Sequence, residues 1–156
     1  MIRFAQANDL PDICRIRRQV HTVHTNGRPD IFREPENLTE FDQFLADNFS
    51  KDNYQLMIYE KTGGIAGYAL IRLVTTKDNC IGQDRFSYFI EEFGVDEGCR
   101  RQGIGTALMN AIFEQAKKNH AASVDLDVWA FNENAEAFYR NLGMKTKRTF
   151  LEFPLG

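Results

Sequence analysis

The sequence has few of the residues that stabilise small secreted or metal-bound domains. Its 156 residues include three cysteines, Cys14, Cys80 and Cys99, which are too few and too scattered for a disulfide framework or a zinc site. No apolar run of roughly 18 residues predicts a transmembrane helix, and the first residues lack the apolar stretch of a secretory signal. The 19 Lys and Arg residues against 22 acidic residues give no positive excess for binding nucleic acid. We therefore expect one domain over residues 1–156 in a reducing cytoplasm.

Apolar periodicity predicts alternating strands and helices. The segments with helical spacing are residues 10–24, 39–49, 104–120 and 132–142, and the strand-like runs are residues 2–5, 55–60, 65–75, 85–95, 123–128 and 144–153. Residues 25–37, with Gly27, Pro29 and Pro35, are expected to form a loop, and Thr39 with Asp42 resembles a helix-capping pair. The strand–helix–strand crossover after residue 86 requires a parallel pair, whereas the earlier hairpins are antiparallel. The predicted fold is α/β (α+β three-layer), in the order β-α-α-β-β-β-α-β-α-β, with a mixed sheet of about six strands and about four helices on its two faces.

A glycine-rich turn follows the strand at residues 85–95. Gly103 and Gly105 would let backbone N–H groups approach an anion, and the N-terminus of the next helix adds its positive dipole. Arg100 and Arg101 supply cations at the same place. The spacing fits neither a P-loop nor a complete dinucleotide fingerprint. The turn is compatible with a phosphate or pyrophosphate site, and also with a tight turn carrying solvated arginines.

Two motifs together resemble the GNAT superfamily of N-acetyltransferases. The first, Arg100-x-x-Gly103-x-Gly105 after an aromatic strand, is similar to motif A of that superfamily. The second, NENAEAFYRNLGM at residues 132–144, is similar to its N-x-x-A-x-x-F-Y-x-x-L-G-F signature, with Met144 in place of the final Phe. The order of elements over residues 1–153 also resembles the GNAT fold, so the resemblance covers nearly the whole chain.

The resemblance implies acetyl-CoA as co-substrate and no metal. The pyrophosphate would lie on the turn formed by Arg100, Arg101, Gln102, Gly103, Ile104, Gly105 and Thr106. The pantetheine arm would run along Phe93, Gly94 and Val95, whose main-chain N–H groups would polarise the acetyl carbonyl. Asn132 matches a family position that hydrogen-bonds the cofactor arm, although a plain helix cap also explains this residue.

Acetyl transfer to an amine requires a proton donor for the departing thiolate and a proton acceptor for the amine. Tyr139 matches the family's donor tyrosine. It lies two helical turns after Asn132, so the two side chains are expected on one face of the helix. Packing beside Phe138 is the structural alternative for Tyr139.

The general base is expected among Glu91, Glu92 and Asp127, in this order. Because adjacent residues of a strand point to opposite faces, only one of the two glutamates is expected to face the acetyl group. Phe89 occupies the position of the family's usual glutamate, and Glu91 has the same parity. Asp127 matches the base of a subset of peptide-acetylating relatives. The alternative is that these are surface carboxylates and that the proton leaves through ordered water.

The sequence thus predicts an acetyl-CoA-dependent N-acetyltransferase that acts on a primary amine, a peptide N-terminus, a lysine or a small amine, by direct transfer in a ternary complex. The alternatives are a transferase for another short acyl-CoA and a non-catalytic acyl-CoA-binding sensor. The expected partners are acetyl-CoA and the amine, without nucleic acid or membrane, and the strand near the C-terminus would suit a homodimer. Acceptor specificity is expected from residues 21–38, including Arg28 to Phe32, with Trp129 and Phe131 as lining or core residues.

Overall fold

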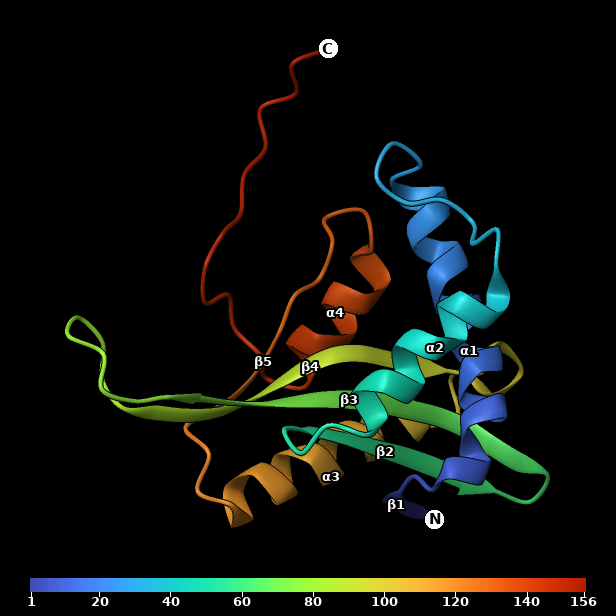
Figure 1. Ribbon diagram of the computed structural model, residues 1–156, viewed down its shortest axis with the longest axis horizontal. Helices are drawn as coiled ribbons and strands as arrows, with labels where there is room; N and C mark the ends of the chain where they lie inside the picture. The colour runs from blue at the N-terminus through green and yellow to red at the C-terminus, as the bar shows by residue number, and fades with distance from the viewer.

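The computed structural model describes residues 1–156 and shows one central sheet with helices on both faces (Figure 1). The strands are β1 (Ile2–Phe4), β2 (Tyr54–Lys61), β3 (Gly64–Thr76), β4 (Arg85–Val95) and β5 (Ser123–Leu126). The helices are α1 (Leu10–Gly27), α2 (Leu38–Phe49), α3 (Ile104–Lys118) and α4 (Glu133–Asn141), and short 3-10 turns lie at Ala7–Asp9 and Glu97–Cys99. None of the helices has both the length and the apolar character that crossing a membrane requires.

The sheet is mixed, as the sequence predicts. The strands follow one another in the order β1-β2-β3-β4-β5, and only the pair β4–β5, joined through α3, is parallel. One apolar cluster lies between the sheet and α1 and α2, and a second lies between the sheet and α3, with side chains of α4 packed against it. The first is built around Ile13, Ile16, Leu45, Ile58 and Tyr68, and the second around Ile71, Tyr88, Leu108, Met109 and Ile112.

The pairing of β4 with its two neighbouring strands is irregular near Glu91. The pairing of β4 with β5 ends at Ile90 and Leu126, so the two strands separate beyond this point. The pairing of β4 with β3 passes from Ile90 directly to Glu92, which leaves Glu91 as a β-bulge. A bulge redirects the side chains that follow it, because the regular alternation of the strand is interrupted.

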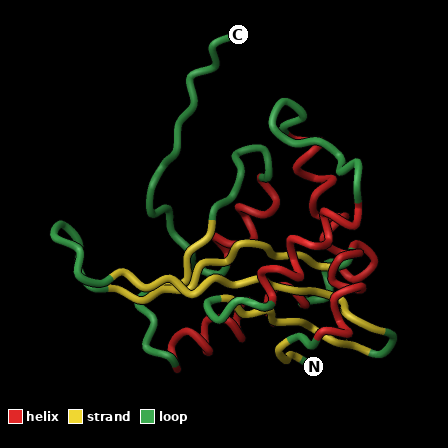
Figure 2. The backbone as a smooth tube through the Cα atoms, in the orientation of Figure 1, coloured by secondary structure: helices red, strands yellow, loops and turns green.

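The prediction of a final strand over residues 144–153 is wrong, and the sheet has five strands instead of about six. The alternating pattern gives these residues the propensity for a strand, but a strand also needs a neighbour to pair with. The chain runs past the four-residue strand β5 with the side-chain contact Lys147–Asp125 and then leaves the sheet (Figure 2). Near residue 153 the segment is held instead by Arg28, whose guanidinium binds the Glu152 carboxylate.

Two smaller expectations also change. Helix α1 continues to Gly27, so the following loop is shorter than predicted. The cap of α2 is Asn37, whose side chain accepts from the N–H groups of Thr39 and Glu40, and not the pair Thr39 and Asp42. The predicted stop of the last helix is confirmed, since Gly143, with φ of 92°, follows the C-cap Leu142 of α4.

Candidate functional site

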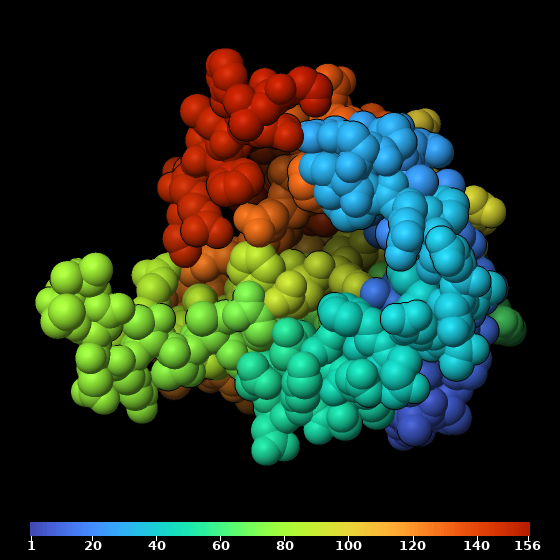
Figure 3. Space-filling view, turned by 45° about the horizontal axis from the view of Figure 1, so that its top comes forward, coloured from blue at the N-terminus to red at the C-terminus, as the bar shows by residue number.

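A cleft of about 840 Å³ opens where β4 and β5 separate. Its walls come from α1, β4, the turn before α3, residues 126–132 and α4. Figure 3 shows the surface hollowed between the α1–α2 loop, in light blue, and the C-terminal residues, in red. Nearly all the predicted site residues line this cleft. The exception is Gln102, whose side chain lies beside Lys61, with 3.5 Å between Nζ and Oε1.

The glycine turn has the geometry of an anion site. Gly103 has φ of 77°, and a Cβ at this position would meet no heavy atom within 4 Å, so the space beside the backbone is open. The backbone N–H groups of residues 102 to 106 have no acceptor within the chain. Arg101 also takes the left-handed region, with φ of 60°, which is uncommon for a residue with a Cβ and recurs at ligand sites.

Helix α1 fixes the start of this turn. The Asp96 carboxylate accepts from the Gly98 N–H at 3.0 Å and is paired with Arg15. The Gln19 side chain accepts from the Glu97 N–H at 3.0 Å. The hydrogen bond from the Arg15 guanidinium lowers the pKa of Asp96, so the carboxylate stays charged at neutral pH. The turn is therefore held by bonds that do not use the free N–H groups.

The strand that leads to the turn has one free edge. Phe93, Gly94 and Val95 pair with β3 on one side, whereas their other side faces the cleft because β5 has already diverged. Gly94 is required here for packing as well, since a Cβ would lie 2.8 Å from both Tyr68 and Val20. The absence of a side chain at Gly94 thus allows α1 to pack closely against this part of β4.

Asn132 and Tyr139 line the opposite wall. The Asn132 side-chain oxygen accepts from the Ala135 N–H at 3.4 Å, so it caps α4, and its amide NH₂ has no acceptor in the chain. The Tyr139 ring lies edge-on to Phe93 with 6.2 Å between centroids. Burial raises the pKa of Tyr139 to about 12, so the phenol is protonated at neutral pH.

The bulge at Glu91 overturns the argument from alternation, because both glutamates line the cleft. Ile90 and Phe93 pack toward the α3 cluster, whereas Glu92 turns to α1. There the Arg17 Nε donates to both Glu92 carboxylate oxygens at 2.9 and 2.8 Å, and the Tyr68 hydroxyl donates to one of them at 3.2 Å. Both Glu92 oxygens thus accept hydrogen bonds, and the Arg17 guanidinium balances the charge of the carboxylate.

The other two carboxylates differ in their surroundings. Glu91 is paired with Arg72, whose guanidinium also lies 5.1 Å from the centre of the Phe89 ring. Asp127 follows β5 directly, is exposed to the cleft, and has no hydrogen-bond or salt-bridge partner in the chain. No group of three or more His, Cys, Asp or Glu side chains is arranged to hold a metal ion.

A cluster of aromatic and imidazole rings, called the aromatic wall below, borders the cleft, and all of its members except Phe131 line it. It is formed by His21, His24, Phe32, Phe41, Trp129 and Phe131. Trp129 stacks on Phe131 with 6.0 Å between ring centroids and meets Phe32 edge-on at 5.2 Å. The sequence points to Phe32, Trp129 and Phe131 singly but does not reveal the cluster, because its members come from α1, the following loop, α2 and the chain after β5.

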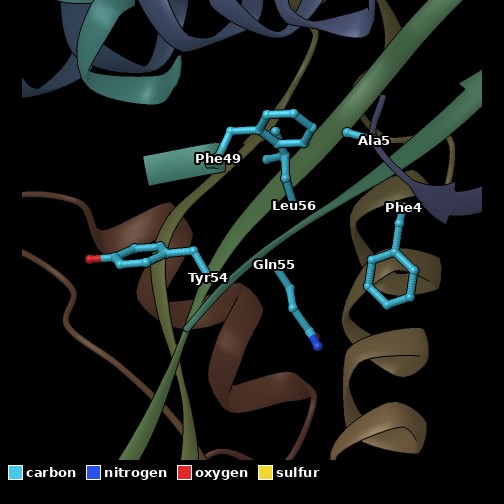
Figure 4. Close-up of a pocket in the computed structure, with 6 residues that line it drawn as sticks. All are labelled: Phe4, Ala5, Phe49, Tyr54, Gln55 and Leu56. Atoms are coloured by element: carbon cyan, nitrogen blue, oxygen red, sulfur yellow. The ribbon is translucent and has the colours of Figure 1, made fainter. Parts of the chain in front are cut away.

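A second, smaller pocket of about 250 Å³ lies between β1, β2 and the end of α2 (Figure 4). It is lined by Phe4, Ala5, Phe49, Tyr54, Gln55 and Leu56. It contains no carboxylate, imidazole or amine, so it lacks the groups that acid–base chemistry at neutral pH would use. The larger cleft is the candidate site.

Comparisons with known proteins agree with this geometry. The model of the acetyltransferase (GNAT) family matches residues 19–144. A solved structure of a mutant BH1408 protein from Bacillus halodurans is 32% identical and has a TM-score of 0.90, covering 99% of each chain. The chain therefore belongs to the acetyltransferase (GNAT) family, and its fold is a GNAT fold with a five-stranded mixed sheet and four helices. The description of this family is that of acetyltransferases.

Two curated relatives match over shorter stretches. The uncharacterized N-acetyltransferase MJ1207 of Methanocaldococcus jannaschii is 45% identical over 58 residues, which is 37% of this chain and 26% of that protein. Streptothricin acetyltransferase A of Bacillus subtilis is 33% identical over 69 residues, 40% of each protein. The matched stretches thus span less than half of either relative.

Proposed function

We propose that the protein is a single-domain N-acetyltransferase that transfers the acetyl group of acetyl-CoA directly to a primary amine in a ternary complex. The observation that carries the proposal is the row of unpaired N–H groups at residues 102 to 106, beside the free edge of β4. A pyrophosphate fits this row, because oriented N–H groups at a helix N-terminus favour an anion. Arg100 and Arg101 would add charge-assisted contacts.

Acetyl-CoA would supply the thioester that is attacked. The N–H groups at the cleft-facing edge of Phe93 to Val95 would hold its arm as an added strand and polarise its carbonyl. The free amide of Asn132 would donate to the same arm while its oxygen caps α4. These roles use donors that have no partner inside the chain.

Tyr139 would donate the proton that the departing sulfur needs. Its raised pKa of about 12 keeps the phenol protonated across the physiological range, and its hydroxyl has no acceptor in the chain. The phenol would transfer its proton to the sulfur as the C–S bond breaks, and the resulting phenolate would regain a proton from solvent before the next turnover.

Among the three carboxylates we propose Asp127 as the general base, in preference to Glu91 and Glu92. A carboxylate whose oxygens already accept hydrogen bonds from a guanidinium has fewer lone pairs left for the N–H of the amine. Glu92 is bound by Arg17 and Glu91 by Arg72, whereas Asp127 has no partner. Glu92 then acts as an anchor between β4 and α1.

The aromatic wall beside an unpaired carboxylate favours a cationic primary amine that carries a flat or apolar group. An ammonium ion is attracted both to Asp127 and to the faces of Trp129 and Phe32. Small amines fit this description, as do a peptide N-terminus or a lysine with an apolar neighbour. One relative, streptothricin acetyltransferase A, is named for a small-molecule acceptor, streptothricin.

The test is release of free CoA thiol from acetyl-CoA in the presence of a panel of amines. On a good acceptor, Tyr139→Phe and Asp127→Asn should each lower kcat by about 10²-fold or more, whereas Glu91→Gln should lower it far less. Thermal stabilisation by acetyl-CoA should be the same in all these variants, which controls for binding and folding. Full activity of both Tyr139→Phe and Asp127→Asn would contradict the assigned roles.

The alternatives give different results in the same assays. A transferase for another short acyl-CoA would release thiol faster from that donor than from acetyl-CoA. A sensor would be stabilised by acetyl-CoA and would turn over none of the amines. Absence of stabilisation by any CoA compound would contradict the proposal as a whole.

A further inference from the structure

One face of α1 lines the cleft, and it carries polar groups that the acetyl transfer proposed above does not use. Residues three and four positions apart share a face of a helix. The residues of α1 that line the cleft follow this spacing and are Arg17, Val20, His21, Val23 and His24. The nitrogen atoms of this face are therefore available to the amine substrate.

The Arg17 guanidinium has one nitrogen without a partner. Its Nε donates to Glu92, and its Nη1 donates to the carbonyl oxygen of Phe41. Its Nη2 donates to no acceptor in the chain, and it is not among the unpartnered nitrogen atoms that are sealed from solvent. Because a guanidinium is planar and this side chain is only 8% exposed, the two other contacts fix the direction of the Nη2 donors.

His21 lies one helical turn after Arg17 and offers an acceptor. Its Nε2 lies 2.7 Å from the carbonyl oxygen of Arg33. A carbonyl oxygen can only accept, so Nε2 carries the proton, and Nδ1 of the neutral ring keeps its lone pair. The Arg17 guanidinium lies 4.0 Å and the His21 ring 5.1 Å from the centre of the Phe41 ring. A free donor and a free acceptor thus lie around one aromatic ring in the wall of the cleft.

We propose, on the basis of the transferase activity proposed above, that Arg17 and His21 bind an α-amino carbonyl unit, so that the substrate is the N-terminus of a peptide. Arg17 Nη2 donates to the carbonyl oxygen of the first residue. His21 Nδ1 accepts one N–H of the α-amine, which orients the amine while Asp127 takes the proton. The side chain of the first residue contacts the aromatic wall.

The chemistry of the other primary amines fits this pair of groups less well. In a peptide N-terminus the amine and the carbonyl are attached to one another through a single carbon, so both reach neighbouring partners. A lysine ammonium follows four methylene groups and has no carbonyl beside it. A free amino acid carries a carboxylate, but the Arg17 charge is already balanced by Glu92, and the unpaired Asp127 would repel a second anion.

The test is calorimetric binding of two probes to the protein saturated with CoA, which requires no turnover. Phenylalaninamide and 2-phenylethylamine differ only in the carboxamide. The wild type should bind the amide about 10-fold or more tightly than the amine. Arg17→Lys keeps a positive charge beside Glu92 but lacks Nη2, so it should reduce this preference to about threefold or less. The basicity of each probe is the same for every variant, so the change in preference reports the protein contact.

Arg18→Lys is the matched control. It makes the same change at the next residue, whose guanidinium pairs with Asp42 and does not line the cleft, so the preference should stay that of the wild type. His21→Phe keeps a ring against Phe41 and removes Nδ1. Because both probes contain the amine, this variant should weaken both by a similar factor and leave their ratio unchanged.

The outcomes separate this recognition from the transferase activity. Equal binding of both probes by the wild type, binding of neither, an unchanged preference in Arg17→Lys, a lost preference in Arg18→Lys, or unchanged affinities in His21→Phe would each overturn the proposal. The wild-type comparison decides even where Arg17→Lys does not fold. The expected preference without release of CoA thiol from acetyl-CoA would support the recognition and contradict the transferase. Thiol release with equal binding of the two probes would do the reverse.

Discussion

Replacing Arg17 with methionine should destabilise this protein far more than removal of an exposed arginine. Arg17 is only 8% exposed, its Nε donates to both oxygens of Glu92, and its guanidinium lies 4.0 Å from the centre of the Phe41 ring. Methionine keeps much of the apolar contact. The change leaves the Glu92 carboxylate with the Tyr68 hydroxyl as its remaining partner.

The expected cost follows from the burial of the pair. Removing one member of a buried ion pair costs about 3–5 kcal/mol, because the other charge stays desolvated without compensation. The Glu92 side chain is 20% exposed, so water recovers part of this loss, and we expect about 3 kcal/mol. The variant Arg17→Met/Glu92→Gln has no uncompensated charge and should be more stable than Arg17→Met alone, by about 1–3 kcal/mol.

Urea unfolding followed by far-UV circular dichroism measures these differences. Arg140→Met is the matched control, since Arg140 and Glu136 form an exposed pair on α4, and its cost should stay below about 0.5 kcal/mol.

Two results would refute this reasoning. A cost of Arg17→Met below about 1 kcal/mol would mean that the pair contributes no more than an exposed one. A double variant that loses the full sum of both single changes would mean that Arg17 and Glu92 are not coupled. A loss of turnover in Glu92→Gln as large as in Asp127→Asn would further assign Glu92 to the chemistry instead of to the anchor.

Three further changes test other parts of the molecule. Gly27→Ala should lower the free energy of unfolding by about 1–3 kcal/mol, because its Cβ would lie 2.3 Å from the Phe131 ring. It should also raise KM for the amine more than KM for acetyl-CoA. Unchanged kinetic constants would contradict the contact between α1 and the aromatic wall. Gly103→Ala should cost about 1 kcal/mol through its positive φ and weaken acetyl-CoA binding in calorimetry, although nothing obstructs its methyl group. Arg3 lowers the pKa of Asp9 below its ordinary 3.8, so this carboxylate stabilises the fold above that pH and the contribution is lost as the pH falls through the lowered pKa. Asp9→Asn should therefore lose stability at neutral pH and approach the wild type below pH 3.8, and a pH-independent difference in unfolding free energy would contradict this.

Local patterns in the sequence were enough to predict the scaffold of the site. Gly103 and Gly105 at the start of an amphipathic segment predicted the turn before α3, and the cap at Asn132 with the stop at Gly143 predicted α4. These features depend on residues within a few positions of one another. Backbone conformation at such positions is decided by short-range sterics and capping, which a sequence records directly.

The sequence could not predict which of Glu91, Glu92 and Asp127 lacks a salt-bridge partner. Arg17 and Glu92 are 75 residues apart, and Glu91 and Arg72 lie on different strands, so no local pattern reveals these pairs. The prediction of a final strand over residues 144–153 was wrong for a related reason. Alternation in residues 144–153 reports propensity, but a strand also requires backbone hydrogen bonds to a neighbouring strand. These residues pair with no strand, and Glu152 is held by Arg28 instead.

The bulge at Glu91 determines which faces of the sheet the side chains of Glu92 and Phe93 occupy. In a regular strand Ile90 and Glu92 would share a face, and Glu92 would be buried against the α3 cluster without a partner. The extra residue turns Glu92 toward Arg17 and leaves Phe93 on the opposite face, against Tyr139. The backbone edge beside Phe93 therefore lies between a fixed carboxylate on one face and a protonated phenol on the other. Because β5 diverges one residue before the bulge, that edge is open to a ligand, and the acyl group of the proposed reaction would lie beside the protonated phenol of Tyr139.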